Sequence, residues 1–449
     1  MSANHTQDNL AWFGELPSHW EYKKIGSLFT ERKVKVSDKE YPPLSVAKIG
    51  VVPQLVTAVK TDAGDNRKLV RTGDFVINSR SDRKGSCGVS ELDGSVSLIN
   101  IVLTPRNEWN GRYVHYLMRS QPFSEEYYRN GRGIVADLWT TRYSEMRSIL
   151  LPIPPRTEQD QIVRFLDWKV SAVNKAIAMR RKQIALLEEH RASTLNTAVT
   201  RGIQSNRSLK YSGMKWLPQI PENWEIIPAK ALFANKRELR HDQDEMMAAT
   251  QKYGIISQKK YMELEGRRIV LANDNLEKWL HVEPDDFIIS LRSFQGGIER
   301  CVEAGCVTWH YVVLKPNSEV VPAFYRWFFK SPAYISALQH TSDFIRDGQD
   351  LRYSNFVKVY LLKIPQIEQM EIAEYLNKVM PWYDMAITKK EEEIKILCEL
   401  RGRLIADVVT GKIDVRDIEV PDFEYVQETG DSSDEDKKDM GDASEDGEE

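Results

Sequence analysis

Residues 73–81 read GDFVINSRS and residues 285–293 read DDFIISLRS, so one apolar segment that ends in arginine and serine occurs twice, 212 positions apart. A second pair surrounds two tryptophans, because WFGELPSHWE at 12–21 corresponds to WLPQIPENWE at 216–225, with an offset of 204. Matches that keep their order at a nearly constant offset indicate a tandem duplication. Solenoid repeats have periods of roughly 20–50 residues, so the duplicated unit here is a whole domain.

Two further matches continue the series. RYS occurs at 142–144 and 352–354, and PRTEQ at 155–159 corresponds to PQIEQ at 365–369, both with an offset of 210. A chain that contains two copies of one domain can have pseudo-two-fold symmetry without forming a dimer.

The first part of each copy is predicted to be a mixed domain. Apolar runs such as 95–103 and 307–314 are bounded by Gly, Asp, Asn and Pro, as strands usually are. One short helix is expected in each copy, near 112–119 and 322–329. The pattern therefore favours a compact α+β domain in each half.

The second part of each copy is predicted to be one long helix. Residues 158–200 contain neither Gly nor Pro, and the equally long segment 368–410 contains one proline, Pro381. A helix of this length extends about 65 Å at 1.5 Å per residue. A 3-4 alternation continues through both segments, which indicates a coiled coil. The two seams are Ile177, Arg180, Ile184, Leu187, Arg191, Thr194 and Ala198, and Ile387, Lys390, Ile394, Leu397, Arg401, Leu404 and Val408.

Charged residues interrupt both seams at equivalent places, namely Arg180 and Lys390, and Arg191 and Arg401. Polar residues at core positions of a coiled coil reduce stability but fix the register and the partner. Because both helices belong to one chain, the simplest model packs them against each other. The alternative is that each helix docks separately on its own domain.

The predicted fold class is therefore α+β, with two tandem mixed α/β domains separated by two long helices that form an antiparallel, pseudo-two-fold symmetric coiled coil. The predicted parts are a first mixed domain (1–155), a first helix (156–203), a linker (204–218), a second mixed domain (219–365), a second helix (366–415) and an acidic disordered tail (416–449).

The net charge of −4 conceals an asymmetry. Residues 428–449 contain eleven acidic residues and two lysines, so the rest of the chain carries +5. A mildly basic body permits a nucleic-acid partner. The acidic tail is predicted to be solvated and disordered, either mimicking the charge of DNA or, as we favour, aiding solubility.

Several classes of protein are excluded or disfavoured. No apolar stretch approaches the roughly 20 residues of a membrane-spanning helix, and residues 1–10 lack the layout of a signal peptide, so we expect a cytoplasmic protein. Cys301 and Cys306 have no second pair of ligands, so buried thiols are a simpler interpretation than zinc. None of the eight histidines has a partner at metal-ligand spacing, and no metal site is predicted.

Catalytic signatures are also absent from the sequence. It contains no Walker A segment, no G-x-G-x-x-G after a strand, no H-E-x-x-H, no G-x-S-x-G, and no Asn-Pro-Pro-aromatic segment of the kind amino-methyltransferases use. A duplicated chain without a catalytic constellation indicates a binding device, so no catalytic residue is predicted.

The repeated motifs resemble those of a known family. A Pro-x-x-Trp-Glu segment opens each half at 17–21 and 221–225, and Pro-Pro-x-x-Glu-Gln precedes the first long helix at 154–159. With these motifs, residues 12–415 resemble the specificity subunit of type I restriction-modification systems. The second copy departs from the pattern, with KIP at 363–365 where the first has IPP, and with Pro381 inside its helix.

This resemblance implies a function without catalysis. Each mixed domain is implied to be a target recognition domain that reads one half of a bipartite double-stranded DNA target, while the helices set the spacing and dock the methyltransferase subunits. The implied partners are two methyltransferase (modification) subunits and restriction (endonuclease/translocase) subunits, and no membrane. This chain is implied to hold no cofactor, since S-adenosylmethionine, ATP and magnesium belong to the partners. Because the two domains have diverged, the target should be asymmetric.

The duplication helps to choose DNA-contacting residues. If the two domains read different bases, residues shared between the copies are expected to contact phosphates, which position the protein without specifying sequence. Arg80 and Arg292 form one shared pair, and Arg142 and Arg352 another. An ion pair within the domain is an equally good interpretation of each. The neighbouring residues Tyr143 and Tyr353 are expected to pack in the core.

Residues that read bases should differ between the copies. Arginine can pair bidentately with guanine and glutamine with adenine, which singles out the loops that contain Arg83 and Gln295. For each candidate a solvated surface charge is the alternative. The remaining candidates are Lys84, Arg132, Trp139, Lys259, Lys260 and Arg346.

Two other functions stay open from the sequence, a DNA-independent scaffold and an enzyme with an unfamiliar site. Salt-dependent DNA binding by a complex with a methyltransferase would separate the first reading from a scaffold. Activity of the isolated chain would be needed to support an enzyme.

Overall fold

The computed structural model describes residues 12–55, 64–80, 83–106, 108–133, 139–250, 253–266, 275–290, 297–341 and 352–428. The chain divides into two compact units. Unit 1 comprises Met1–Arg181 and Glu391–Glu449, and unit 2 comprises Lys182–Lys390. Each unit therefore combines one mixed domain with a part of both long helices.

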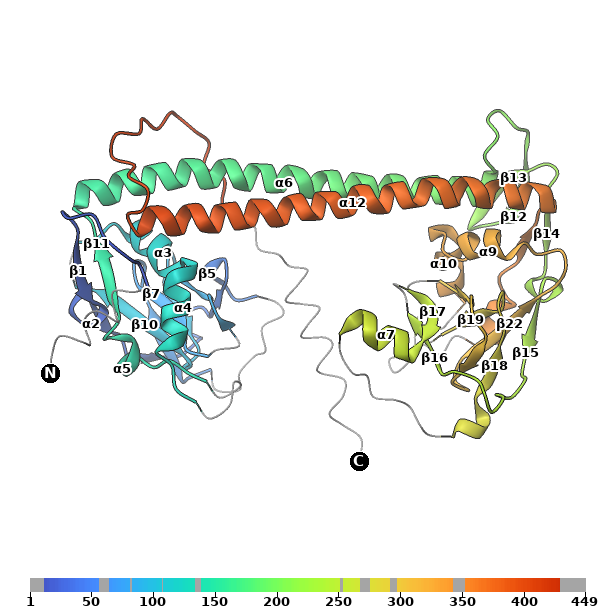
Figure 1. The fold of residues 1–449 in the computed structure, drawn as a ribbon, viewed down its shortest axis with the longest axis horizontal. Helices are drawn as coiled ribbons and strands as arrows, with labels where there is room; N and C mark the ends of the chain where they lie inside the picture. Colours follow the sequence, from blue (N-terminus) through green and yellow to red (C-terminus); the bar gives the residue numbers. More distant parts are fainter. Residues whose placement is uncertain are drawn as a thin grey trace. The chain divides into compact units, whose positions relative to one another are not determined.

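The mixed domain of unit 1 is built on a four-stranded antiparallel sheet. Its strands lie in the order β2 (Phe29–Glu31), β10 (Asn100–Pro105), β7 (Phe75–Asn78) and β8 (Cys87–Val89). All four residues of β7 are buried, the three apolar residues Phe75–Ile77 as well as Asn78. Helix α3 (Gly111–Arg119) packs against β8, and α4 (Gln121–Arg129) follows at once (Figure 1).

Smaller elements complete this domain. They are a three-stranded sheet of β3 (Lys35–Val36), β6 (Arg67–Val70) and β9 (Gly94–Val96), a hairpin of β4 (Leu44–Ala47) and β5 (Gly50–Pro53), and the short helices α2 (Ile25–Leu28) and α5 (Tyr143–Met146). Strand β1 (Glu21–Lys24) pairs with β11 (Leu150–Ile153), so the first and last strands of the domain lie side by side and close it. The long helix α6 (Arg156–Arg201) starts directly after this closure.

Unit 2 repeats the plan. Its main sheet has the order β15 (Phe233–Lys236), β22 (Val312–Pro316), β19 (Phe287–Ile289) and β20 (Glu299–Arg300), which matches β2-β10-β7-β8 position by position. Strands β14 (Glu225–Ile227) and β23 (Leu361–Lys363) close the domain as β1 and β11 do. The duplication predicted from the sequence is confirmed at the level of sheet topology.

Further elements of unit 2 surround this sheet. They are the paired strands β16 (Met247–Thr250) and β17 (Gly254–Ser257), the paired strands β18 (Leu280–Val282) and β21 (Gly305–Val307), the helices α7 (Gln258–Glu265), α9 (Pro322–Phe328), α10 (Pro332–Gln339) and α11 (Tyr353–Phe356), the short 3-10 helices η3 (Ala229–Ala231) and η4 (Leu276–Lys278), and the long helix α12 (Gln366–Val409). Helix α12 continues through Pro381.

The two long helices run antiparallel within each unit. In unit 1, Arg180 of α6 forms an ion pair with Glu393 of α12, while Asn174 lies opposite Arg401. In unit 2, Arg191 lies 2.8 Å from Asp384. The predicted seam positions are buried or half-buried along both helices, and the seam arginines pair across it. The coiled coil is therefore confirmed, and a role of its charges in fixing the register stays a prediction.

The long helices also belong to the domain cores. In unit 1, Leu166 and Val170 of α6 and Val408 of α12 join the cluster that contains Phe75 and Tyr113. In unit 2, Leu195 and Val199 of α6 and Ile372 and Leu376 of α12 join the corresponding cluster. The helices thus pair with each other, and each one also contributes to the cores of both domains. The model that packs them against each other is confirmed, and the alternative of separate helices, each docked on its own domain, is wrong.

The glutamines of the two EQ motifs anchor the helix starts. The Gln159 side chain accepts a hydrogen bond from the backbone N–H of Asn110 at 3.1 Å and donates one to the Pro154 carbonyl at 3.0 Å. Gln369 makes equivalent contacts in unit 2, with Val321 and Ile364, at 2.8 Å each. This repeated motif therefore fixes the angle at which each helix leaves its domain.

The structure corrects the predicted tail. Residues 416–428, predicted to be disordered, lie along the helices of unit 1. The amide of Asn174 donates to the Val426 carbonyl at 2.9 Å, and the Val426 N–H donates to Ser171 Oγ at 3.0 Å. Arg112 lies 4.8 Å from the centre of the Tyr425 ring. The apolar and aromatic side chains of this segment, Ile418, Val420 and Tyr425, pack within unit 1 although the segment is rich in acidic residues. The rest of the acidic tail, 429–449, lies outside the described residues.

The segment predicted as the linker contains strand β12 (Leu209–Met214), which forms a hairpin with β13 (Leu217–Pro221).

Cys301 and Cys306 are buried free thiols, and burial raises the pKa of Cys306 to about 11, as expected for structural cysteines. Among the described helices, none has the length and apolar character needed to cross a membrane.

Candidate nucleic-acid interface

The first predicted DNA-contacting loop lines a small cleft at the end of β7. The cleft is formed by the loop that carries Arg80, Arg83 and Lys84, together with Tyr128 of α4 and Trp139. We call it the loop cleft. It encloses only about 20 Å³, room for roughly one water molecule. The exposed side chains of Arg80, Arg83 and Lys84 at its rim can reach a large partner.

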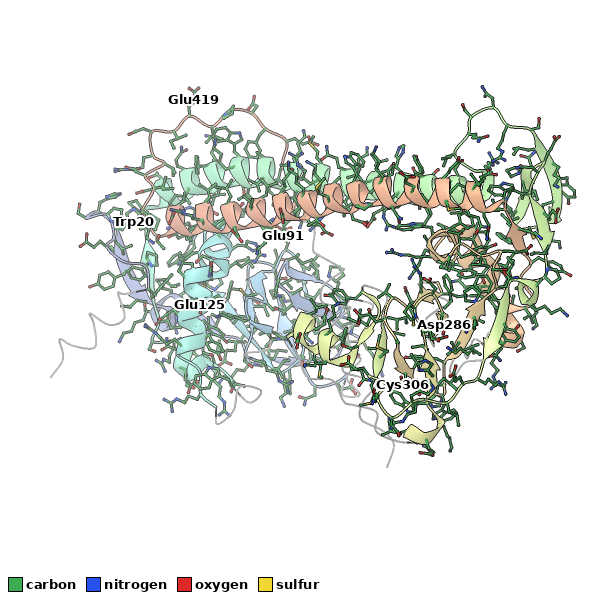
Figure 2. All side chains as sticks on the ribbon, turned by 45° about the vertical axis from the view of Figure 1, so that its right-hand side comes forward. Trp20, Glu91, Glu125, Asp286, Cys306 and Glu419 are labelled. Carbon is green, nitrogen blue, oxygen red and sulfur yellow. The ribbon has the colours of Figure 1, made fainter. Side chains whose placement is uncertain are left out.

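Aromatic packing organises the loop cleft. The Trp139 indole N–H donates to the Tyr128 carbonyl at 2.9 Å, and the two rings lie 5.8 Å apart. Lys84 Nζ lies 4.9 Å from the centre of the Tyr128 ring and 2.7 Å from the carboxylate of Glu125. Glu125 lies on α4 and is labelled in Figure 2. Trp139 is therefore a support of the loop, and its polar atom is already used within the domain.

Backbone contacts connect Arg80 and Arg132 to the same support. Both residues form antiparallel bridges with Thr140. The Arg132 guanidinium is 84% exposed and lies 3.8 Å from Glu145, a weak surface contact. Arg80 and Arg83 are exposed. The structure thus brings together five of the predicted residues of the first domain, namely Arg80, Arg83, Lys84, Arg132 and Trp139.

A larger groove lies beside the loop cleft, with Ser79 at the border of both. Its volume is about 760 Å³, and its charged lining residues are five cations and one carboxylate. We call it the basic groove, defined by Lys33, Lys68, Arg106, Arg142, Arg147 and Glu31. An excess of positive charge in a hollow raises the local concentration of an anionic partner.

Internal contacts occupy some of the cations of the basic groove, because Lys68 Nζ donates to the Asn100 carbonyl at 2.6 Å and Arg106 Nε to the Phe29 carbonyl at 3.3 Å. Lys33 and Lys68 share the Glu31 carboxylate, at 3.2 and 3.9 Å. Burial lowers the pKa of Lys68, and Glu31 opposes that shift. Arg106, Arg142 and Arg147 are exposed. The groove therefore offers cationic side chains in a form suited to phosphate contacts.

Of the basic groove, the sequence predicted only Arg142, which is the N-cap residue of α5. The neighbouring Tyr143 donates its hydroxyl to the Phe29 carbonyl at 3.1 Å, and Tyr353 donates to the Phe233 carbonyl at the same distance. These paired contacts support the core-packing interpretation of both tyrosines.

Three of the four missed cations differ between the copies, whereas Lys33 corresponds to Arg237. Arg147 corresponds to Val357 at the offset of 210. Arg106 corresponds to Asn317, because their backbone N–H groups bond to the equivalent carbonyls of Leu28 and Leu232. These cations lie on four separate segments of the chain, so no spacing in the sequence indicates that they share one groove.

In unit 2 the described candidates are fewer. Lys259 and Lys260 are exposed at the start of α7, where Ser257 Oγ accepts a bond from the Lys260 N–H at 3.2 Å. Lys260 Nζ also lies 3.9 Å from Glu303. Arg352 is exposed and caps α11 as Arg142 caps α5. The predicted residues Arg292, Gln295 and Arg346 lie outside the described residues.

The fold was compared with known proteins. No protein-family model and no curated protein matches the sequence. Among solved structures, a chain from a study of complex assembly and conformational transition of the type I R-M system matches with a TM-score of 0.65 and 13% identity, over 89% of this chain and 100% of that chain. The HsdS subunit from Thermoanaerobacter tengcongensis matches with 15% identity and a TM-score of 0.45, over 89% of this chain and 98% of that chain. The S subunit of a type I restriction-modification system from M. genitalium matches with 15% identity and a TM-score of 0.35, over 92% and 99%.

Identities this low establish likeness of fold alone, and the match with a TM-score of 0.65 carries that likeness. The resemblance seen in the repeated motifs is confirmed at that level. The chain has, over 89% of its length, the fold of a chain from a type I restriction-modification system.

Proposed function

We propose that this chain is the DNA specificity subunit of a type I restriction-modification complex. The observation that carries the proposal is the basic groove of the first domain, with five cations against one carboxylate, next to the exposed arginines of the loop cleft. Phosphate contacts in the groove would position the domain, and side chains of the loop cleft would reach base edges.

The duplication supports a bipartite target. Each recognition domain would read one half of the DNA sequence, and the two long helices would set the spacing and dock two methyltransferase subunits. Because the loops that carry Arg83 and Gln295 differ between the copies, the two half-sites should differ in sequence. The complete target is then asymmetric, with an unread gap between its halves.

Catalysis is assigned to the partners in this proposal. The methyltransferase subunits would bind S-adenosylmethionine, and the restriction subunits would use ATP and magnesium. This chain would hold none of these cofactors. Its body carries only +5, so high affinity for DNA is expected from the assembled complex and not from the isolated chain.

The test is a genome-wide map of methylated adenine in the host, with and without the gene. Loss of one split, asymmetric motif on deletion is the expected result and would also give the target sequence. Restoration by a plasmid copy is the control. If a methyltransferase copurifies with the tagged chain while the map stays unchanged, the specificity role is wrong and a scaffold role replaces it.

A further inference from the structure

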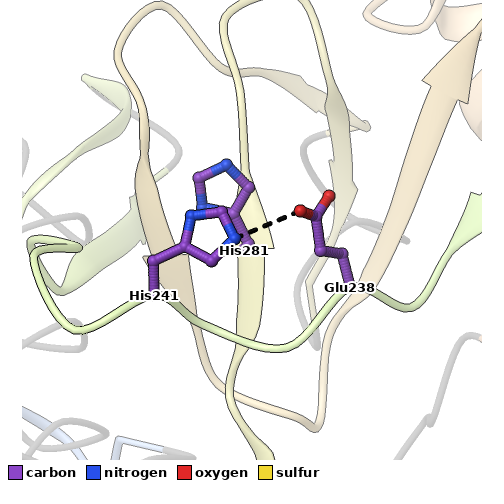
Figure 3. Close-up of side chains that lie close together, drawn as sticks. All are labelled: Glu238, His241 and His281. Atoms are coloured by element: carbon purple, nitrogen blue, oxygen red, sulfur yellow. Dashed lines mark hydrogen bonds and ion pairs between the residues drawn. The ribbon is translucent and has the colours of Figure 1, made fainter.

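Two histidines and a glutamate from separate segments meet in unit 2. Glu238 and His241 lie in 237–246, which connects β15 to β16, and His281 lies on β18. One potential ligand atom of each residue lies within 4.8 Å of those of the other two (Figure 3). About 40 residues separate the two segments in sequence, so no spacing motif could reveal this group.

The present contacts hold the three side chains close to one another. His241 Nε2 lies 3.2 Å from Glu238 Oε1, and the two imidazole rings stack with centres 4.0 Å apart. Asp244 connects both histidines, because its Oδ2 accepts the His241 backbone N–H at 2.8 Å and lies 2.9 Å from His281 Nδ1. A carboxylate bound to a histidine ring is the usual support of a metal-binding imidazole.

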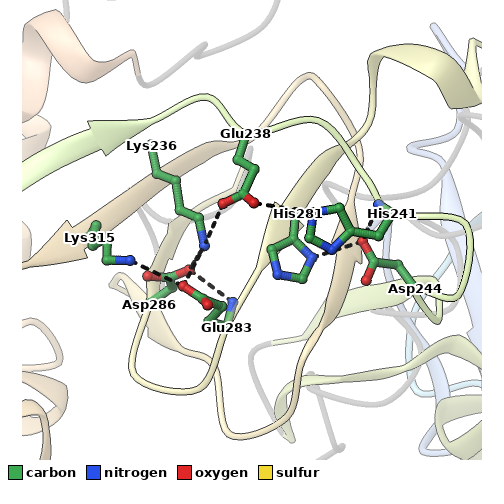
Figure 4. A network of polar contacts seen from close by, with 8 residues as sticks. All are labelled: Lys236, Glu238, His241, Asp244, His281, Glu283, Asp286 and Lys315. Atoms are coloured by element: carbon green, nitrogen blue, oxygen red, sulfur yellow. Dashed lines mark hydrogen bonds and ion pairs between the residues drawn. The ribbon is translucent and has the colours of Figure 1, made fainter.

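The neighbouring ion pairs leave Glu238 available. Lys236 lies 2.9 Å from Glu283 and 3.0 Å from Asp286, whereas its distance to Glu238 is 3.5 Å (Figure 4). The Lys236–Asp286 pair corresponds to the bond between Arg32 and Asp74 in unit 1. Lys236 therefore keeps two closer carboxylates if Glu238 turns toward a cation.

The first copy shows that the fold does not need these polar residues. The His281 N–H donates to the Glu238 carbonyl at 2.8 Å, and the Leu69 N–H donates to the Val34 carbonyl at 2.9 Å. These backbone contacts identify Val34 and Leu69 as the counterparts of Glu238 and His281. His281 and Leu69 are each only 7% exposed. A buried imidazole costs more than a buried leucine unless it gains a strong partner.

We propose that Glu238, His241 and His281 bind one divalent transition-metal ion of the zinc class, with Asp244 supporting His281. Two imidazoles and a carboxylate are a donor set typical of zinc in proteins. The ion would fasten the segment 237–246 to strand β18. This inference is independent of the proposed function, since it concerns metal binding by the chain itself.

The test uses the full-length, untagged chain after treatment with a chelator. Co²⁺ is titrated while its ligand-field absorption is followed, Zn²⁺ is then used to displace it, and calorimetry gives the stoichiometry. The expected result is one ion per chain and a melting temperature that rises with Zn²⁺, because a ligand bound only by the folded state stabilises it.

The variants copy the first domain so that they should fold. Glu238→Val and His281→Leu introduce the residues that unit 1 carries at these positions, and each is expected to weaken metal binding at least 100-fold. Asp244→Asn should weaken it about 10–100-fold, as loss of a supporting carboxylate does. His310→Ala, which removes an exposed histidine elsewhere in unit 2, is the matched control and should bind as the wild type does. Absence of saturable binding by the wild type, or unchanged binding by His281→Leu, would overturn the proposal.

Discussion

The carboxylate of Glu158, the third residue of α6, accepts a hydrogen bond from the Trp20 indole Nε1 at 3.0 Å. The second copy repeats the contact between Trp224 and Glu368, the third residue of α12, at 2.9 Å. Each bond joins the start of a mixed domain to the start of the helix that follows it. The tryptophan and glutamate that define the repeated motifs thus act in the architecture, away from the basic groove.

The first prediction concerns Glu368. Burial by itself would raise the pKa of this carboxyl, but hydrogen bonds from Arg207 and Trp224 outweigh burial, and the pKa is lowered from 4.5. Glu368→Gln is expected to reduce the free energy of unfolding by about 1–3 kcal/mol near neutral pH, because it removes charge-assisted hydrogen bonds.

The sign of the pH dependence follows from that lowered pKa. The contribution of Glu368 is complete above about pH 4.5 and is lost as the pH falls through the pKa of the folded state. Urea unfolding of the wild type and of Glu368→Gln should therefore converge in acid. Glu371→Gln, an exposed change on the same helix, is the control. A difference between wild type and Glu368→Gln that stays constant from pH 7 to about pH 3 would contradict this explanation.

The second prediction concerns the charges of the coiled coil. Arg191 bonds to Asp384 at 2.8 Å in unit 2, and Arg401 bonds to Asn174 at 2.7 Å in unit 1. These pairs are equivalent at the offset of 210, so the first copy has an amide where the second has a carboxylate. Glu428 of the C-terminal segment supplies the missing charge, 2.6 Å from Arg401.

We therefore expect Glu428→Gln to loosen residues 415–428, raising their rate of amide hydrogen exchange, with a cost of about 0.5–1 kcal/mol for this partly exposed pair. Asn174→Asp restores the carboxylate found in unit 2, so the effect of Glu428→Gln on the melting temperature should shrink in that background. Equal effects in both backgrounds would show that Arg401 does not couple the two positions.

The duplication and the coiled coil were predictable because both are periodic in the sequence. The seam positions, from Ile177 to Ala198 in the first helix, follow from spacing alone and needed no knowledge of the tertiary fold. Strand order required the structure, since β2, β10, β7 and β8 are neighbours in the sheet but not in the chain.

The candidate interface was only partly predictable for the same reason. Arg80, Arg83 and Lys84 lie in one loop and could be found together, whereas Lys33, Lys68, Arg106 and Arg147 come from four segments that only the folded domain brings into one groove. The order of residues 416–428 was missed because the prediction rested on the high charge of the tail and gave no weight to Ile418, Val420 and Tyr425, which pack within unit 1.

The third prediction tests the basic groove. Lys33→Ala combined with Arg147→Ala should weaken binding of the assembled complex to every DNA sequence, because phosphate contacts carry no sequence information. Removing one cation that neutralises a phosphate should reduce the slope of log affinity against log salt by about 0.9. Arg156→Ala removes one positive charge outside the groove lining and is the control for the loss of a single charge. A change confined to one base of the target would contradict the phosphate role. Arg292→Ala, in the second domain, is predicted to behave as the groove variants do.

The fourth prediction tests the loop cleft. Arg83→Ala should relax the reading of one base in the half-site of the first domain, with a loss of discrimination of about 1–3 kcal/mol, and leave the other half-site intact. Gln295→Ala should do the reverse, since it lies in the corresponding loop of the second domain. The measurement is the pattern of adenine methylation produced in cells by complexes that carry each variant. Because the two variants exchange the roles of target and control, each half-site reports on the other. If Arg83→Ala relaxed both half-sites equally, Arg83 would be a general contact, and base reading would have to come from other residues of the first domain.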